Sequence, residues 1–159
     1  MARKHVSDPT LVNEVAQNLF LALPIFRKRL LHMDVIQREF NIPLSHVQVL
    51  SMLKDNGSMT VSEISRRLGI AKPNITPLID RLIESEYVMR QRNDEDHRRV
   101  NITICPSGEE RIAEIRVKMQ ELVGEWAGEF TSAELKRLNA GLQSITEILG
   151  SHLQAPEHG

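Results

Sequence analysis

The sequence contains little cysteine, glycine or proline, and no long hydrophobic run. Cys105 is the only cysteine among 159 residues, so the chain cannot form an internal disulfide; this is typical of a reducing compartment, and we expect a cytoplasmic protein. The 8 glycines and 7 prolines, with 41% hydrophobic and 26% charged residues, exclude collagen-like and disordered chains. No apolar run reaches the roughly 18 residues of a membrane span, and no signal peptide is expected. The chain is long enough for one compact domain with a real core.

The charge is nearly balanced overall but unevenly distributed. The formal net charge of −1 argues against a generally basic nucleic-acid-binding protein. Residues 1–104, however, have a net charge of +3, whereas residues 105–159 have −4. Any contact with a polyanion is therefore expected in the first two-thirds of the chain.

Several short patterns predict where helices begin. In a capping box, a Ser or Thr side chain and a Glu or Gln three residues later satisfy each other's backbone N–H groups. Asp8-Pro9 predicts a further start, because Asp can cap a helix and Pro suits its first position. The candidate boxes are Ser45/Gln48, Thr60/Glu63, Ser107/Glu110 and Thr131/Glu134. With the apolar spacing that follows, they predict helices over about 9–40 (kinked or broken at Pro24), 45–55, 61–68, 72–85, 107–128 and 131–149.

The middle of the chain predicts a winged helix-turn-helix. Two short helices, 61–68 and 72–85, are separated by a tight turn containing Gly69. Residues 88–92 and 98–104 then predict a β-hairpin with a charged loop, in which Val100, Ile102 and Ile104 alternate as on a strand with one buried face. The expected fold is mainly α with this small hairpin.

Apolar stripes on the helices at 9–40, 107–128 and 131–149 predict a helical dimerisation region, because one small chain is not expected to cover all three. The alternative is a monomer whose three helices close on one another. We expect an N-terminal dimerisation helix at 1–43, a DNA-binding winged helix-turn-helix at 44–105, C-terminal dimerisation helices at 106–150 and a flexible tail at 151–159.

A helix followed by an arginine-bearing loop suits DNA, because a helix fits the major groove and an arginine fits the narrow, electronegative minor groove. Asn74 could bond base edges, and Asp96 could orient Arg98 by paired hydrogen bonds. The alternative for each basic residue is a hydrated surface charge. The candidate DNA-binding residues are Arg66, Lys72, Asn74, Thr76, Arg81, Arg92, Asp96, His97, Arg98 and Arg99.

The order of elements resembles the multiple antibiotic resistance regulator (MarR) family of winged-helix transcription factors. Asp94, Asp96 and Arg98, the strand to Ile104, and Gly108 are similar to the family's wing pattern D-x-D-x-R, strand, L-T-x-x-G. The resemblance implies that Arg98 enters the minor groove, that residues 72–85 contact the major groove and that the outer helices dimerise. It also implies a repressor of a pseudo-palindromic operator, controlled by a small molecule or by redox chemistry.

Two departures from the family pattern concern the structure. Ile104-Cys105 stands in place of L-T, so Ser107 is expected to cap the next helix instead. Glu86 stands where the family has Gly before an aromatic residue; a left-handed conformation there would cost about 1 kcal/mol.

Other functional classes have weaker support. We expect no enzyme and no cofactor, because no nucleophile–base pair, phosphate-binding Gly-rich loop or carboxylate pair is present. The six His residues have no metal-ligand spacing, so no metal is expected. The alternatives are a winged-helix module that binds a partner protein, and a thiol-based redox-sensing repressor using Cys105. A small-molecule effector pocket is predicted at Leu23, Phe26, Leu30, Met52 and Trp126; the alternative, which explains such residues better, is plain core packing.

Overall fold

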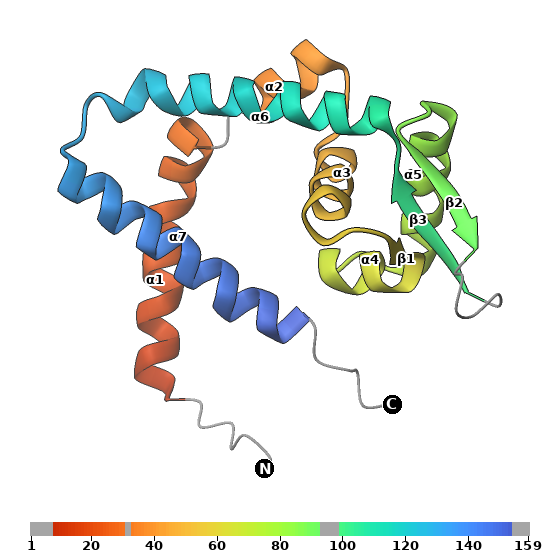
Figure 1. Ribbon diagram of the computed structural model, residues 1–159. Helices are drawn as coiled ribbons and strands as arrows, with labels where there is room; N and C mark the ends of the chain where they lie inside the picture. The colour runs from red at the N-terminus through yellow and green to blue at the C-terminus, as the bar shows by residue number, and fades with distance from the viewer. Residues whose placement is uncertain (1–7, 31–32, 93–98, 154–159) are drawn as a thin grey trace. The chain divides into compact units, whose positions relative to one another are not determined.

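The computed structural model describes residues 8–30, 33–92 and 99–153 (Figure 1). The chain forms two compact units, residues 1–35 and 36–159, which are described separately. Among the described residues, no helix combines the length and apolarity needed to span a membrane.

Helix α1 (Pro9–Ile25) begins as predicted. The Thr10 N–H donates to Asp8 Oδ1 at 2.9 Å, and Pro9 occupies the first turn. The single helix predicted over 9–40 is interrupted: a π-helical turn, η1 (Phe26–Leu30), follows α1, and α2 (Met33–Phe40) comes after it. The expected break follows Pro24, whose missing N–H removes a bond from the α-helical ladder.

The second unit contains five further helices and a small sheet. The helices are α3 (Leu44–Asn56), α4 (Val61–Leu68), α5 (Lys72–Glu84), α6 (Pro106–Ala127) and α7 (Ser132–Leu153). Apolar side chains of α3, α4, α5, α6 and β3 provide most of the core. The most deeply buried residues include Leu50, Leu53, Ile64, Ile75, Ile79, Ile102, Ile112 and Ile115.

The sheet has three antiparallel strands in the order β1-β3-β2. They are β1 (Met59–Thr60), β2 (Val88–Arg92) and β3 (Val100–Ile104), and Ile102 of β3 pairs with both Met59 and Arg90. β1 was not predicted, because two residues carry no strand pattern. Val100, predicted on the buried face, is 44% exposed whereas Ile102 is fully buried, since Val100 pairs with Arg92 at the loop end of the hairpin. The fold is therefore a mainly helical winged helix-turn-helix.

Two of the predicted capping boxes are present. The Glu63 N–H donates to Thr60 Oγ1 at 3.2 Å, and the Thr60 N–H donates to Glu63 Oε2 at 2.7 Å. The Glu134 N–H donates to Thr131 Oγ1 at 3.3 Å, and the Thr131 N–H donates to Glu134 Oε2 at 2.8 Å. In both cases the polar pair provides hydrogen-bond acceptors for N–H groups at the start of the helix.

The other two predicted boxes are wrong. Helix α3 starts at Leu44 with Pro43 as its extended N-cap, and α6 starts at Pro106 after Cys105; neither cap makes a side-chain hydrogen bond. In each case a proline beside the start, whose φ is fixed, moves the boundary ahead of the predicted serine. Ser107, expected to cap α6, instead donates from Oγ to the Glu86 carbonyl at 2.6 Å.

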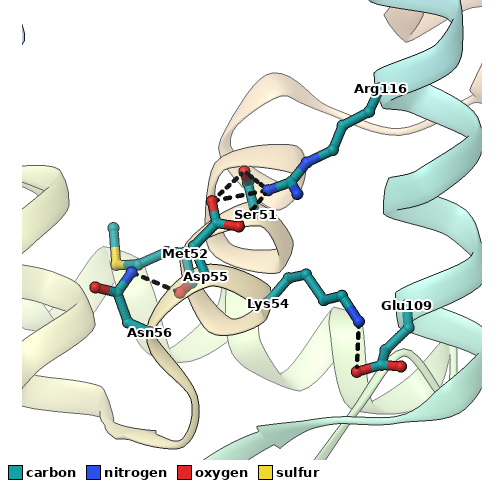
Figure 2. A network of polar contacts seen from close by, with 7 residues as sticks. All are labelled: Ser51, Met52, Lys54, Asp55, Asn56, Glu109 and Arg116. Atoms are coloured by element: carbon teal, nitrogen blue, oxygen red, sulfur yellow. Dashed lines mark hydrogen bonds and ion pairs between the residues drawn. The ribbon is translucent and has the colours of Figure 1, made fainter.

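Polar contacts join α3 to α6 (Figure 2). Nη2 of Arg116 lies 2.7 Å from both carboxylate oxygens of Asp55 and 2.9 Å from Ser51 Oγ. Two turns nearer the start of α6, Lys54 Nζ lies 3.0 Å from Glu109. The helix that follows the wing is thus tied to the helix that precedes the helix-turn-helix.

Candidate nucleic-acid interface

The turn between α4 and α5 is held by backbone and side-chain bonds. Gly69 takes a left-handed conformation (φ 64°, ψ 26°) that ends α4. The buried Ser65 donates from Oγ to the Ile70 carbonyl at 2.6 Å. Helix α5 then starts after Ala71. This turn sets the direction in which α5 leaves α4.

The first turn of α5 presents polar side chains to solvent. The helix buries Ile75 and Ile79, so Lys72, Asn74 and Thr76 are exposed. Thr76 Oγ1 donates to the Lys72 carbonyl at 3.2 Å and keeps its acceptor capacity. Within the described ranges the Asn74 amide has no hydrogen-bond partner. This turn therefore offers a cation, an amide and a hydroxyl, the groups that bind base edges and phosphates.

The predicted residues on α4 and at the base of the wing lie near one another. Thr60, through its backbone N–H and then its hydroxyl, lowers the pKa of Glu63; the positive charges of Arg66 and Arg99 lower it further. Arg66, Arg92 and Arg99 are all exposed. Arg66 and Arg99 are thus brought toward the same carboxylate, although 33 positions separate them in the sequence. Asp96, His97 and Arg98 lie outside the described residues.

Arg81 lies toward the opposite end of α5 from Lys72. It is exposed and stands near His46, whose pKa is lowered first by burial and then by the Arg81 charge. Asn74 and Arg81, seven positions apart on α5, both line a groove of about 360 Å³ that also contains His46 and Pro77. Arg81 and Asn74 therefore share a face of the helix.

An ion pair that the sequence did not predict connects the wing to α5. Arg90 of β2 donates from Nη2 to Asp80 Oδ1 of α5 at 2.6 Å. The two residues are not neighbours on one element, so no local pattern could have paired them. The hairpin and the helix that carry most of the candidate residues are held in one unit by this contact.

The predicted effector pocket remains a prediction. Leu23 is exposed on α1 and Phe26 is half-buried in η1, both in the first unit; the side chain of Leu30 lies outside the description. Met52 and Trp126 are half-buried in the second unit. The Trp126 ring meets Phe130 edge-on at 5.6 Å. Its Nε1–H is buried without a hydrogen-bond partner in the described part of the chain.

Cys105 is a half-buried N-cap residue whose N–H donates to the Tyr87 carbonyl at 2.9 Å. It lines a pocket of about 630 Å³ with Met89 and Arg90. Over the residues that the structure covers, no group of three or more His, Cys, Asp or Glu side chains could hold a metal ion. The thiol-sensing alternative is untested by this geometry.

Comparison with known proteins decides the family. A sequence model described as "MarR family" matches residues 42–100, which span the helix-turn-helix and most of the wing. Residues 42–100 of the chain belong to the MarR family of transcriptional regulators.

Two curated relatives of this MarR-family chain come from Bacillus subtilis (strain 168). The HTH-type transcriptional regulator YsmB is 33% identical over 96 residues, which cover 60% of this chain and 66% of YsmB. The HTH-type transcriptional repressor MdtR is 26% identical over 87 residues, which cover 55% of this chain and 56% of MdtR. The chain thus spans less than two thirds of the length of either relative, and both are named as regulators rather than enzymes.

Solved structures agree on the fold of the MarR-family chain. A MarR family protein from Bacillus stearothermophilus superposes with a TM-score of 0.72 at 22% identity, over 91% of this chain and 99% of the other. At this identity the likeness concerns the fold alone.

Proposed function

We propose that the chain is a homodimeric repressor that binds an inverted-repeat operator and leaves it when a small-molecule effector binds. One observation carries the proposal: the exposed polar first turn of α5 and the basic hairpin belong to one unit, joined by the Asp80–Arg90 ion pair. A helix and a basic hairpin held together suit simultaneous contact with adjacent major and minor grooves.

The proposed roles follow from residue chemistry. Asn74 bonds a base edge in the major groove, and Lys72 and Thr76 contact phosphate or base. Arg98 enters the minor groove, oriented by Asp96. The remaining candidates, Arg66, Arg81, Arg92, His97 and Arg99, are assigned to the DNA backbone and the groove edges.

The proposed dimer uses the outer helices. Val12, Val15, Leu19 and Leu23 of α1 are each more than half exposed, and Ile145 and Leu149 of α7 are 48% and 60% exposed. Burying such faces between two copies is a common remedy for exposed apolar surface. In this proposal residues 1–43 and 106–150 dimerise, residues 44–105 bind DNA and residues 151–159 form a tail.

A relative and the geometry of a dimer on DNA support the repressor role and the inverted-repeat operator. MdtR is named as a repressor, which supports the same sign of regulation here. Two copies of α5 in successive major grooves, roughly 34 Å apart, require an inverted repeat. A cytoplasmic location agrees with the single cysteine.

Selection and titration test DNA binding. The purified chain is mixed with a library of inverted-repeat duplexes at two salt concentrations, and the bound fraction is sequenced. We expect one enriched palindrome whose affinity falls steeply with salt. Asn74→Ala and Arg98→Ala should each weaken it about tenfold or more, whereas Arg137→Ala, an exposed arginine of α7, should not. Absence of enrichment would contradict the proposal and favour the protein-binding module.

Effector release is proposed to act through the separation of the two DNA-binding units, by selecting a dimer geometry that does not fit the operator. Spin labels on Met89→Cys, a half-exposed wing position, in a Cys105→Ser chain would report that separation. We expect two distance populations whose ratio changes when operator DNA is added. A single unchanged distance in the free, DNA-bound and effector-bound dimers would contradict the mechanism. Oxidant-induced DNA release that is lost in Cys105→Ser would support the thiol alternative.

A further inference from the structure

The outer strand β2 leaves one edge of the sheet open. It stands last in the order β1-β3-β2, so it pairs with β3 on one side and with no other described strand on its second side (Figure 1). Val88 is buried, whereas residues 89–92 are exposed. Open strand edges bind other chains unless a charge, a proline or a covering segment protects them. The exposed part of this edge is therefore a candidate surface for a further strand.

The register shows which backbone groups face the open edge. The Cys105 N–H donates to the Tyr87 carbonyl, so this carbonyl points toward β3. The direction of the N–H and C=O groups alternates from one strand residue to the next, so Met89 also bonds to β3. The N–H and C=O groups of Arg90 and Arg92 therefore point away from β3, toward the open edge.

The positive charge of Arg90 does not protect this edge. Its Nη2 lies 2.6 Å from Asp80 Oδ1 of α5, so an acidic partner compensates the charge and the side chain is drawn toward the helix. Arg92, two residues nearer the loop, forms no ion pair within the described ranges. Uncompensated positive charge is thus limited to the loop end of the exposed edge.

A hollow of about 630 Å³ lies beside the same strand. Met89 and Arg90 both line it, although adjacent strand residues point their side chains to opposite faces of a sheet. The hollow therefore follows the edge of β2 rather than one face. The last turn of α5 contributes Ile83 and Glu84, and Glu86 follows in the turn before β2.

The walls of this hollow carry an excess of negative charge. Asp80 and Arg90 compensate each other, which leaves the carboxylates of Glu84 and Glu86. Both residues are exposed, and in the part of the chain that the structure describes neither carboxylate forms a hydrogen bond or an ion pair. An occupant that carries positive charge at this end of the edge would complement the two carboxylates.

We propose that the open edge of β2 binds an extended segment of a partner protein, which adds a strand to the sheet and carries Lys or Arg at one end. The backbone groups of Arg90 and Arg92 would pair with the segment, as in other complexes formed by strand addition. Its basic end would lie beside Glu84 and Glu86, and a neutral end would lie beside Arg92. The first turn of α5, proposed to contact DNA, is at the opposite end of that helix, and the binding does not depend on the proposed DNA function.

Fluorescence anisotropy of labelled peptides with the full chain, in the absence of DNA, tests the proposal. The probes are the peptide Lys-Val-Lys-Val-Thr-Val, the same peptide with Glu in place of Lys, and the basic peptide with its amide nitrogens methylated. We expect the unmodified basic peptide to bind about tenfold or more tightly than either control, since the controls lose the charge complementarity or the backbone donors. Equal binding of the methylated peptide would mean attraction without strand pairing. That result, equal binding of the acidic peptide, or binding of no peptide would overturn the proposal.

Carboxylate variants locate the basic end of the peptide. The double variant Glu84→Gln, Glu86→Gln changes two exposed side chains and should weaken the basic peptide about tenfold. Glu125→Gln, which removes an exposed carboxylate of α6, should leave its affinity unchanged. Equal affinities of the double variant and the control would show that the peptide binds elsewhere, and the proposed site would be wrong.

Two variants of Arg92 test the backbone contact. Arg92→Pro removes an N–H that faces away from β3, a position that an edge strand tolerates, and should weaken the peptide severalfold. Arg92→Gln removes the same charge but keeps the N–H, and should not weaken it. Equal affinities of the two variants would contradict strand addition at this edge. The methylated peptide makes the same test on the unchanged chain if Arg92→Pro does not fold.

The concentration of the chain separates a partner segment from a second copy. Peptide affinity should be the same at low and high chain concentration. An affinity that falls as the chain concentration rises would mean that a second copy of the chain occupies the edge, and would overturn the assignment to a partner protein.

Discussion

At the scale of single residues, Gly108 lies against the backbone of a distant segment. A Cβ added to Gly108 would lie 2.2 Å from the Tyr87 carbonyl oxygen and 3.0 Å from Ile104 Cγ1. The same turn is held by the Ser107 bond to Glu86 and by the Cys105 N–H bond to the Tyr87 carbonyl. The start of α6 and the end of α5 therefore approach so closely that only glycine fits.

Gly108→Ala should consequently lower the free energy of unfolding by about 2 kcal/mol, because backbone rather than a flexible side chain must move. Urea denaturation measures the change. Gly124→Ala is the control: it lies in the same helix, its Cβ would meet nothing within 4 Å, and alanine should stabilise that position by about 0.5–1 kcal/mol. Equal effects at the two positions would show that helix propensity, not the close approach, determines the result.

Glu86 is a non-glycine residue in a backbone conformation that favours glycine. Its φ of 58° is the left-handed conformation that was expected from the family's Gly at this position. The N–H of the next residue, Tyr87, donates to the Leu82 carbonyl. Glu86→Gly should therefore raise the free energy of unfolding by about 1 kcal/mol. Glu84→Gly, at the last residue of α5, should instead lower it. Thermal and urea unfolding of the two variants would reveal whether the signs differ as expected.

At the scale of elements, short polar contacts determine where helices begin and how the wing is held. The Thr60/Glu63 box fixes the start of α4, and the Asp80–Arg90 pair joins α5 to β2. Such contacts on half-exposed side chains contribute modestly to stability. Their larger effect is on the positions of the elements that carry the candidate DNA contacts.

The capping box makes part of the stability depend on pH. The Thr60 bonds hold the pKa of Glu63 below its ordinary value of 4.5, so this contribution is complete above that value and is lost as pH falls through the lower folded-state pKa. Thr60→Ala should lower the free energy of unfolding by about 1 kcal/mol at pH 7 and by less at pH about 3. Urea denaturation at both pH values tests this, with the neighbouring exposed Ser62→Ala as control. A cost that does not change with pH would contradict the role of the carboxylate.

The Asp80–Arg90 pair should affect DNA binding more than folding. Its side chains are 48% and 51% exposed, so Arg90→Met should change the free energy of unfolding by less than about 1 kcal/mol. If the pair positions the wing, operator affinity should fall about threefold to tenfold, and Asp80→Asn should give no further loss in the double variant. Fluorescence anisotropy measures the affinities. Additive losses would mean that each residue contacts DNA independently.

At the scale of the whole molecule, the first unit is the main reason to expect a second copy. Leu19 and Leu23 of α1 are 54% and 60% exposed, and their neighbours on the same face are similar. Isolated exposed apolar residues are common, but a continuous helical face is typical of an interface. Because the DNA target is proposed to be an inverted repeat, dimerisation and DNA affinity should change together.

Leu19→Glu places a charge in this face and should convert the dimer to a monomer, as measured by light scattering after size-exclusion chromatography. Operator affinity should fall with it, because two linked binding events become one. Gln17→Glu introduces the same side chain on the opposite side of α1 and should leave the dimer intact. A wild-type monomer, or a Leu19→Glu chain that stays dimeric, would contradict the proposed interface.

Much of the local structure could be predicted because its causes lie within a few residues. Asp8, the Thr60/Glu63 and Thr131/Glu134 boxes, the bounds of α4 and the left-handed Glu86 all depend on bonds between near neighbours or on one residue's own conformation. The two wrong boxes are exceptions, because a nearby proline (Pro43 or Pro106) placed the start of each helix ahead of the predicted serine. The family could be recognised for the same reason: its pattern is a run of local signals in a fixed order.

Tertiary structure decided what depends on distant parts of the chain meeting. The two-residue β1 exists because Met59 pairs with Ile102, and Val100 is exposed because it lies at the loop end of the hairpin. Arg90 pairs with Asp80, and the Arg111 guanidinium lies near the Phe40 and Tyr87 rings, only because folding brings these distant segments together. The sequence by itself therefore determined the helices, most of their boundaries and the resemblance to the family. The Asp80–Arg90 ion pair and the contacts of Arg111 arose from long-range packing, which leaves no periodic or local pattern in the sequence.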